Sequence, residues 1–329
     1  MTAFTTSVQP TRKRAFLSRR FPDDVERRIA ERYDVVRNAG DTFLSVDELS
    51  LAAKDCDYLF ISAMENVDRA VFLQLAPELK AVATLSVGFN HIDIEAAREH
   101  GVAVFYSPGV LSDACAEMAL MLLLNAARRG YEADRMVRTN TWPGYAPTQL
   151  LGIGLVGRRA GILGMGRIGQ AVAQRLRGFG IEVHYHNRTR LSQADEAGAT
   201  FHESAESLLA VSDFFIICAP ATTGLAGFLN RERIEMLPPR AIVINISRGE
   251  SIEDDALIDA LQSGRIFAAG LDVFTNEPVI DPRYRELTNV FLTPHIASAT
   301  VDARNAMGFI LLDGLAAYEE GQKAENQLC

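Results

Sequence analysis

The most constraining feature of the chain is a short apolar run that leads into a glycine-rich turn and then into a helical segment. The turn reads Gly164-Met165-Gly166-Arg167-Ile168-Gly169, with the spacing Gly-x-Gly-x-x-Gly. Residues 170–179 then place their apolar side chains on one face of a helix. Such glycines permit a tight turn, close approach of a pyrophosphate and close helix–strand packing, and the helix N-terminus offers free N–H groups to the anion. Residues 164–169 are therefore predicted to bind a dinucleotide.

The end of the next strand indicates which dinucleotide is bound. Residues 181–186 are predicted as this strand, and Asn187-Arg188-Thr189-Arg190 follows it. An NAD site usually has an acidic residue here for the ribose 2′-hydroxyl, and this segment has none. A carboxylate would repel a 2′-phosphate, whereas arginines and short polar side chains bind it. NADP(H) is the expected cofactor and NAD(H) the weaker one, and a solvated basic turn is the simpler interpretation of the same residues.

Composition limits the class of protein. The 329 residues carry a net charge of −9 and are 48% hydrophobic, which suits two large cores and argues against a nucleic-acid partner. The four cysteines show no C-x-x-C spacing, and the six histidines form no metal-ligand pattern. A metal site is therefore not expected, and the cytoplasm is the expected location. The longest apolar run, 118–125, is too short to span a bilayer, so no membrane partner is expected.

Strand-like and helix-like segments alternate along the chain, which is typical of doubly wound parallel sheets. The first part has no phosphate fingerprint, and its strands are expected near 14–18, 57–62, 81–85 and 102–105. Six further strands match a dinucleotide-binding sheet, at 160–163, 181–186, 213–218, 241–247, 267–273 and 290–292. The last helix, 301–318, is expected to return to the first domain.

The predicted fold class is therefore α/β, with two doubly wound parallel-sheet domains. A flavodoxin-like substrate-binding domain is expected to be discontinuous, formed by residues 1–107 and 299–329. A Rossmann dinucleotide-binding domain is expected to span 108–298. Ligands of such sheets bind at the carboxyl ends of the strands.

Three ionisable residues directly follow predicted strands of the second domain: Arg248, Glu277 and His295. Taken singly, such an arginine is usually solvated, a Glu-Pro pair is usually a turn, and a lone histidine is usually structural. Their shared location beside a predicted nicotinamide site makes them a candidate catalytic group.

The chain resembles the D-isomer-specific 2-hydroxyacid dehydrogenases nearly from end to end. The motifs that carry the resemblance lie at residues 86–93, 164–169, 245–249, 270–278 and 294–300. Asn-Arg-Thr after the second strand is similar to the NADPH-preferring glyoxylate/hydroxypyruvate reductases of this family.

The resemblance implies hydride transfer from nicotinamide to the carbonyl carbon of a 2-oxo acid. His295, as an imidazolium, gives the carbonyl oxygen its proton, and Glu277 binds the other ring nitrogen. Arg248 binds the substrate carboxylate and polarises the carbonyl. The N–H groups of Val87 and Gly88 are implied as a second carboxylate anchor, with an ordinary strand-to-helix turn as the alternative.

The resemblance also suggests less direct roles for other residues. Ser298 is placed near substrate, and Asp272 near the nicotinamide carboxamide, with a buried structural aspartate as the alternative. Trp142 either packs in a core or reaches across a homodimer to wall the partner's pocket. The other residues expected along the cofactor are Cys218, Pro220, Thr223 and Ile246.

Two alternatives to a glyoxylate/hydroxypyruvate reductase stay open. One is a dehydrogenase for another D-2-hydroxy acid, such as phosphoglycerate, or for a branched 2-oxo acid. The other is a non-catalytic nucleotide-sensing scaffold, because related co-repressors keep the same arginine, glutamate and histidine. Turnover with small 2-oxo acids separates an enzyme from a scaffold.

Overall fold

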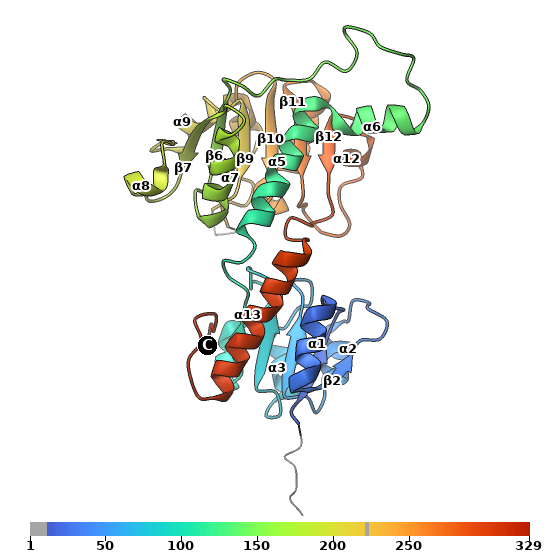
Figure 1. The fold of residues 1–329 in the computed structure, drawn as a ribbon, viewed down its shortest axis with the longest axis vertical. Coiled ribbons are helices and arrows are strands. Elements are labelled where there is room, and N and C mark those ends of the chain that lie inside the picture. The colour runs from blue at the N-terminus through green and yellow to red at the C-terminus, as the bar shows by residue number, and fades with distance from the viewer. Residues whose placement is uncertain (1–11, 221–223) are drawn as a thin grey trace, which may run out of the picture. The chain divides into compact units, whose positions relative to one another are not determined.

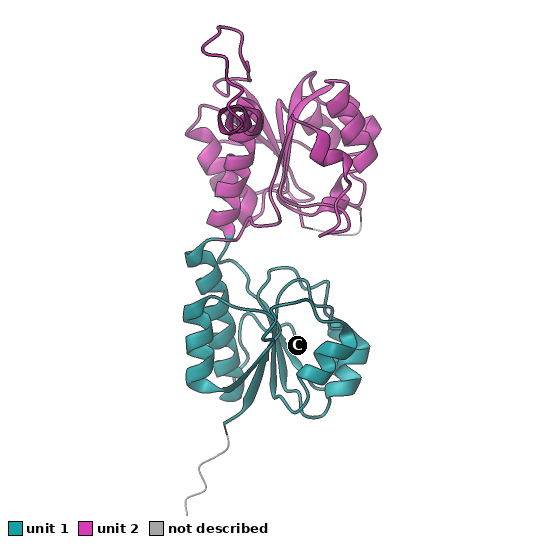
Figure 2. Ribbon diagram, turned by 90° about the vertical axis from the view of Figure 1, so that its right-hand side faces the viewer, with its two compact units in different colours: residues 1–111, 300–329 teal, residues 112–299 magenta. Residues whose placement is uncertain are grey.

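A computed structural model describes residues 12–220 and 224–329. The chain forms two compact units (Figure 2): unit 1 is Met1–Leu111 with Thr300–Cys329, and unit 2 is Ser112–Ala299. Each unit is built on one parallel sheet. The predicted fold class of two parallel-sheet α/β domains is confirmed.

Unit 1 contains a five-stranded sheet in the order β2-β1-β3-β4-β5, the flavodoxin-like order. Every residue of β3 and β4 is buried, as expected for central parallel strands covered on both faces. The strands are β1 (Arg14–Leu17), β2 (Asp34–Arg37), β3 (Tyr58–Ile61), β4 (Ala81–Thr84) and β5 (Ala103–Phe105).

Helices cover both faces of this sheet (Figure 1). One face packs against α2 (Val46–Ala52), α3 (Arg69–Leu75) and α4 (Ile94–Glu99), which share one hydrophobic core with the strands. The other helices are α1 (Asp23–Arg32) and α13 (Val301–Glu319). They contact each other, and α13 also contacts β4 and β5.

Unit 2 contains a seven-stranded sheet in the order β12-β11-β10-β9-β6-β7-β8. The strand order reverses between β6 and β9, the switch point at which doubly wound sheets bind dinucleotides. The strands are β6 (Arg159–Leu163), β7 (Glu182–His186), β8 (Thr200–Phe201), β9 (Phe214–Ile217), β10 (Ala241–Asn245), β11 (Ile266–Leu271) and β12 (Val290–Leu292).

Two helices, α5 (Ser112–Arg128) and α7 (Arg167–Arg177), pack side by side on one face of the unit 2 sheet (Figure 1). A second core contains buried residues of α9 (Ala205–Leu209), α10 (Arg231–Met236) and α11 (Asp254–Gln262). The remaining elements are short or peripheral: α6 (Gly130–Arg138), α8 (Gln193–Glu196), the 3-10 helix η1 (Gly249–Ser251) and α12 (Arg283–Glu286).

Two strands were not expected from the sequence, β2 and β8. Both lie at an edge of their sheets, where half-exposed side chains remove the apolar run that marks a buried strand. No helix among the described residues has the length and hydrophobicity needed to cross a bilayer.

Candidate active site

Three neighbouring strands of unit 2 end just before the residues that the sequence singles out. The strands β10, β11 and β12 are adjacent, and Arg248, Asp272 and His295 follow their carboxyl ends. The Asp272 N–H donates to the Asn245 carbonyl at 3.0 Å, which continues the sheet pairing past the strand ends. Arg248, Asp272 and His295 therefore lie along one edge of one sheet.

His295 and Glu277 form a close pair at this edge. The Nδ1 of His295 lies 2.6 Å from Oε2 of Glu277, and the other glutamate oxygen accepts the Phe274 N–H at 2.7 Å. Nε2 of His295 has no hydrogen-bond partner among the residues that the structure describes. With Nδ1 held by a carboxylate, the ring presents Nε2 to a ligand.

The charge of Glu277 is favoured by its surroundings. Burial would raise the pKa of its carboxyl, but the hydrogen bonds from His295 and from the Phe274 N–H outweigh burial and lower this pKa. The positive charge of Arg248 also lowers the pKa of Glu277, so Arg248 lies within electrostatic reach of the pair. The three predicted catalytic residues thus lie in three different segments and form one charged group.

Asp272 holds the segment that carries the histidine. Its carboxylate accepts the N–H groups of Ile296 at 2.9 Å and Ala297 at 2.8 Å, and the Thr293 hydroxyl at 2.6 Å. The side chain is fully buried, and burial raises the pKa of Asp272 although these hydrogen bonds oppose the shift. His295 adopts a φ of +52°, which few non-glycine residues adopt, and the hydrogen bonds on both sides fix this backbone.

Arg248 is positioned by the turn after β10. Its carbonyl accepts the Asn245 side-chain amide at 2.8 Å and the Ser251 hydroxyl at 2.7 Å, and Asn245 is fully buried. The guanidinium is half-buried and donates one hydrogen bond to the Ser247 carbonyl at 2.8 Å. Most of its five N–H donors are left for a carboxylate or carbonyl ligand.

The glycine turn fits a pyrophosphate. A Cβ on Gly169 would overlap the Gly164 carbonyl oxygen, so only glycine allows this approach of α7 to the turn. A Cβ on Gly166 would meet nothing within 4 Å, which leaves open space beside the backbone. Gly166 caps α7 without a side-chain hydrogen bond, so the first N–H groups of this helix are not satisfied by a cap. Met165 is buried, and Arg167 and Ile168 begin the helix.

The loop after β7 contains the residues predicted to select the cofactor. Asn187 Oδ1 accepts the Met165 N–H at 2.6 Å. Arg188 and Thr189 are exposed, and Arg188 pairs with no carboxylate among the described residues. Arg190, in contrast, donates to Glu196 with Nε at 2.7 Å and with a terminal nitrogen at 3.2 Å. The arginines of this loop are therefore not equivalent.

The other predicted cofactor residues follow β9 and β10. Cys218 and Pro220 come directly after β9, and burial raises the pKa of the Cys218 thiol. Ile246 is buried after β10. Thr223 lies outside the described residues. Ser298 is half-buried, three residues beyond His295.

The other two predicted substrate regions differ in their surroundings. In unit 1, the Ser86 hydroxyl donates to the Gly88 carbonyl at 2.6 Å, and the N–H groups of Val87 and Gly88 donate to no described residue. In unit 2, Trp142 is 58% exposed, and its indole N–H donates to Gln149 at 3.3 Å. Trp142 therefore does not pack in the core of its own chain.

Three residues of this site were missed by sequence reasoning: Asn245, Thr293 and Glu196. Each acts through another residue, respectively Arg248, Asp272 and Arg190. A buried asparagine at the end of an apolar strand was the one available signal, since a buried amide needs partners.

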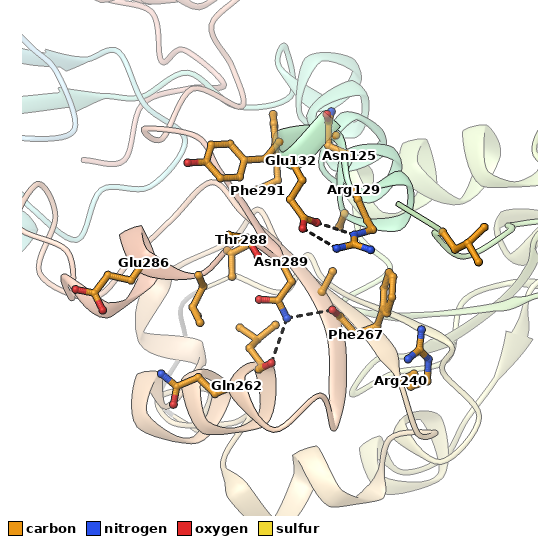
Figure 3. A pocket seen from close by; sticks show the side chains of 18 residues that line it. Asn125, Arg129, Glu132, Arg240, Gln262, Phe267, Glu286, Thr288, Asn289 and Phe291 are labelled. Carbon is orange, nitrogen blue, oxygen red and sulfur yellow. Dashed lines mark hydrogen bonds and ion pairs between the residues drawn. The ribbon is translucent and has the colours of Figure 1, made fainter. Parts of the chain in front are cut away.

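A separate cavity of about 510 Å³ is lined by none of the residues predicted for the active site (Figure 3). Phe267 and Val290, near the amino ends of β11 and β12, help to line it. Asn289 donates to two backbone carbonyls in it, and Arg129 pairs with Glu132 at 2.6 Å. Asn289, Arg129 and Glu132 therefore have hydrogen-bond or ion-pair partners among the residues that line this cavity.

The chain matches a family model and is similar to individual known proteins. Residues 120–297 match the model of the D-isomer specific 2-hydroxyacid dehydrogenase, NAD binding domain. The chain is 40% identical to the glycerate dehydrogenase of Hyphomicrobium methylovorum over 299 residues, which covers 90% of this chain and 93% of the relative.

Two solved structures are similar to this chain over nearly their whole length. A Polaromonas sp. JS6 66 protein assigned to the D-isomer specific 2-hydroxyacid dehydrogenases has 55% identity and a TM-score of 0.95, with 97% of this chain and 100% of that chain covered. The NADPH-dependent glyoxylate/hydroxypyruvate reductase of Sinorhizobium meliloti, in complex with NADP and malonate, has 31% identity and a TM-score of 0.85, with 97% of each chain covered.

Proposed function

Because the chain belongs to the D-isomer-specific 2-hydroxyacid dehydrogenase family, we propose that it reduces small 2-oxo acids with NADPH. Glyoxylate and hydroxypyruvate are the proposed substrates, and the corresponding 2-hydroxy acids are the products. Unit 2 is the proposed dinucleotide-binding domain, and unit 1 the proposed substrate-binding domain.

The hydrogen bond between His295 and Glu277 carries the proposal. His295 is proposed to donate a proton from Nε2, because the Glu277 carboxylate at Nδ1 orients the ring and leaves Nε2 free. The substrate carbonyl oxygen accepts this proton while the carbonyl carbon gains a hydride, so the oxo group becomes a hydroxyl. His295 is left neutral and regains its proton from solvent.

Arg248 is proposed to bind the substrate. Its free N–H donors suit both the carboxylate and the carbonyl oxygen of a 2-oxo acid, and they stabilise the negative charge that develops on that oxygen. Val87 and Gly88 are proposed to contact the substrate through N–H groups that donate to no described residue. Ser298 is proposed to contact the substrate as well.

The cofactor is proposed to be held by unit 2. A bound dihydronicotinamide dinucleotide would supply the hydride. Residues 164–169 bind its pyrophosphate, with Cys218, Pro220 and Ile246 alongside, and Asp272 near the carboxamide. Arg188, exposed and unpaired among the described residues, binds the 2′-phosphate together with Asn187 and Thr189. The complex of the Sinorhizobium meliloti relative with NADP supports the choice of cofactor.

The proposed substrates are supported by the names of the relatives. The Sinorhizobium meliloti protein is a glyoxylate/hydroxypyruvate reductase, and the Hyphomicrobium methylovorum protein is a glycerate dehydrogenase. Glyoxylate has two carbons, and hydroxypyruvate and glycerate have three. Glyoxylate and hydroxypyruvate present the carboxylate and adjacent carbonyl that Arg248 is proposed to bind, and glycerate is the 2-hydroxy acid formed from hydroxypyruvate.

A homodimer is also proposed. The segment that follows α6 is drawn as a long loop in Figure 1, and Tyr145 within it is 88% exposed. Trp142 and Leu151 of the same segment are exposed too. A run of large exposed apolar side chains is typical of a surface covered by a partner, and a second copy is the proposed partner.

The decisive experiment measures the loss of reduced-nicotinamide absorbance. NADPH and NADH are each paired with glyoxylate, hydroxypyruvate, pyruvate and a bulky 2-oxo acid. Rapid loss with NADPH and the two small acids is expected. Preference for NADH would overturn the assignment of residues 187–189 to the 2′-phosphate site. No turnover despite tight cofactor binding would overturn the proposal that the protein is an enzyme.

A variant of His295 tests the proton donor in the same assay. Asn is the suitable replacement, because it tolerates the φ of +52° at this position better than most residues. His295→Asn is expected to abolish reduction while NADPH affinity, measured by fluorescence titration, stays within about twofold. Equal loss of activity and of cofactor binding would show that His295 is structural.

A further inference from the structure

The loop that is proposed to select NADPH contains a second arginine that is already occupied. Arg190 donates two hydrogen bonds to the Glu196 carboxylate, at 2.7 and 3.2 Å. The same carboxylate accepts the Tyr185 hydroxyl at 2.8 Å, and that hydroxyl accepts the Leu191 N–H at 3.1 Å. The guanidinium also lies over the Phe201 ring, 5.5 Å from its centroid. Arg190 is thus bound on several sides within its own unit.

Glu196 is a carboxylate close to the proposed 2′-phosphate site. Only one residue separates Arg188 from Arg190, so their Cα atoms lie within about 7 Å of each other. Glu196 in turn contacts the side chain of Arg190 directly, and only 8% of its own side chain is exposed. A phosphate bound within about one Debye length of Glu196 would experience its charge, and burial of this carboxylate reduces its screening by solvent.

We infer that Arg190 favours NADPH by neutralising Glu196, and that Arg188 is the arginine that contacts the 2′-phosphate. The inference rests on the proposed function, because it deepens the assignment of the NADPH site. A free carboxylate at Glu196 would repel the 2′-phosphate and would leave NADH, which lacks this phosphate, unaffected. Arg190 and Glu196 together are therefore a specificity-determining pair, although neither needs to contact the cofactor.

This role predicts non-additive behaviour of the two residues. If Arg190 bound the phosphate itself, the double variant would still lack that contact and would stay well below wild type. If Arg190 acts by neutralising Glu196, removal of both charges restores the preference for NADPH. A double-mutant cycle separates these two cases.

The experiment uses the full-length protein and four forms: wild type, Arg190→Gln, Glu196→Gln and the double variant. Calorimetric affinity for 2′,5′-ADP relative to 5′-AMP reports the 2′-phosphate contribution without requiring turnover. Arg190→Gln is expected to lower this ratio about fivefold, and Glu196→Gln alone is expected to keep it at or above the wild-type value. The double variant is expected to return to within about twofold of wild type.

A matched control removes a different carboxylate, on the strand β7 that precedes the loop. Glu182 is exposed at the amino end of β7, about 13 Å along the strand from His186. Adding Glu182→Gln to Arg190→Gln is expected to restore nothing. Thermal unfolding of each variant shows whether it is folded. If Arg190→Gln does not fold, Arg190→Met with the same partner substitutions completes the cycle.

The outcomes distinguish the inference from the proposed function. If wild type binds 2′,5′-ADP no better than 5′-AMP, the assignment of NADPH fails and the inference fails with it. If wild type prefers 2′,5′-ADP and the double variant remains as low as Arg190→Gln, NADPH selection stands and only the inference is overturned. A fall in the ratio for Glu196→Gln alone would overturn it as well.

Discussion

Asn187 Oδ1 accepts the backbone N–H of Met165 at 2.6 Å, and this hydrogen bond joins the loop after β7 to the glycine turn. Met165 and Asn187 are 22 residues apart in sequence, but they follow the carboxyl ends of two neighbouring strands, β6 and β7. One side chain therefore links the proposed pyrophosphate site to the proposed 2′-phosphate site. This gives Asn187 and Arg188, which are adjacent, different expected effects on the two cofactors.

Replacing Asn187 with Ala is expected to weaken NADH binding as well as NADPH binding, with the larger loss for NADPH because of the proposed contact of Asn187 with the 2′-phosphate. The variant loses the acceptor that holds the Met165 N–H, and the glycine turn is common to both cofactors. A neutral hydrogen bond of this kind contributes about 1 kcal/mol, which is about fivefold in affinity. Fluorescence titration with each reduced cofactor measures the effect. A loss confined to NADPH would show that Asn187 acts mainly at the 2′-phosphate.

Replacing Arg188 with Ala is expected to affect NADPH alone. An arginine–phosphate contact contributes about 1.5–3 kcal/mol, so the KM for NADPH should rise at least tenfold. The KM for NADH is the internal control and should change by less than about twofold. If both constants rise together, the 2′-phosphate is bound elsewhere.

Replacing Glu277 with Gln is expected to lower the kcat of reduction about tenfold and to leave NADPH affinity nearly unchanged. The Glu277 carboxylate accepts a hydrogen bond at Nδ1 of His295, and this hydrogen bond lowers the pKa of Glu277, so the carboxylate stays charged at neutral pH. A glutamine can turn either its oxygen or its N–H groups toward Nδ1, so it no longer fixes which ring nitrogen carries the proton. Steady-state kinetics and fluorescence titration with NADPH measure the two effects. An unchanged kcat would remove Glu277 from the mechanism.

Replacing Glu319 with Gln is expected to reduce stability at neutral pH. Its carboxylate accepts Tyr58 at 2.7 Å, Lys13 at 3.2 Å and Arg32 at 3.1 Å. Burial would raise the pKa of Glu319, but the hydrogen bonds from Tyr58 and Lys13 outweigh it and lower this pKa. Because the folded-state value is the lower one, the stabilisation is present above the unfolded pKa of about 4.3 and is lost as the pH falls.

Urea unfolding at several pH values tests the Glu319 prediction. At pH 7 the variant should lose about 1–2 kcal/mol, because two of the three partners are partly exposed and screened. Below pH 4 its stability should approach that of wild type. Glu320→Gln, an exposed neighbour, is the matched control and should change stability little. A difference that persists in acid would assign the effect to packing.

Much of the fold could be predicted from the sequence, because the patterns that mark its strands and helices lie within short segments of the chain. Buried parallel strands such as β3 and β9 are continuous apolar runs, and the glycine turn identifies its own strand and helix. The edge strands β2 and β8 have no such run and were missed. Their pairing is set by the neighbouring strand rather than by their own residues.

Pairings between distant residues could not be predicted in the same way. Ionisable residues after strands were visible in the sequence, but it did not show that Asp272 binds the backbone of residues 296 and 297. It also did not distinguish Arg188 from Arg190, because the carboxylate that separates their roles lies on α8, six residues beyond Arg190.

Unit 2 is one uninterrupted stretch of the chain, whereas unit 1 is assembled from the two segments that flank it. The glycine turn, the loop after β7 and the group of Arg248, Glu277 and His295 all lie within that stretch. A single genetic exchange of codons 112–299 would therefore transfer the proposed cofactor site and the proposed catalytic group together. The turn at Val87 and Gly88 would stay with the recipient. The proposed carboxylate anchor in unit 1 can thus diverge separately from the proposed catalytic and cofactor residues, which are encoded by one continuous segment.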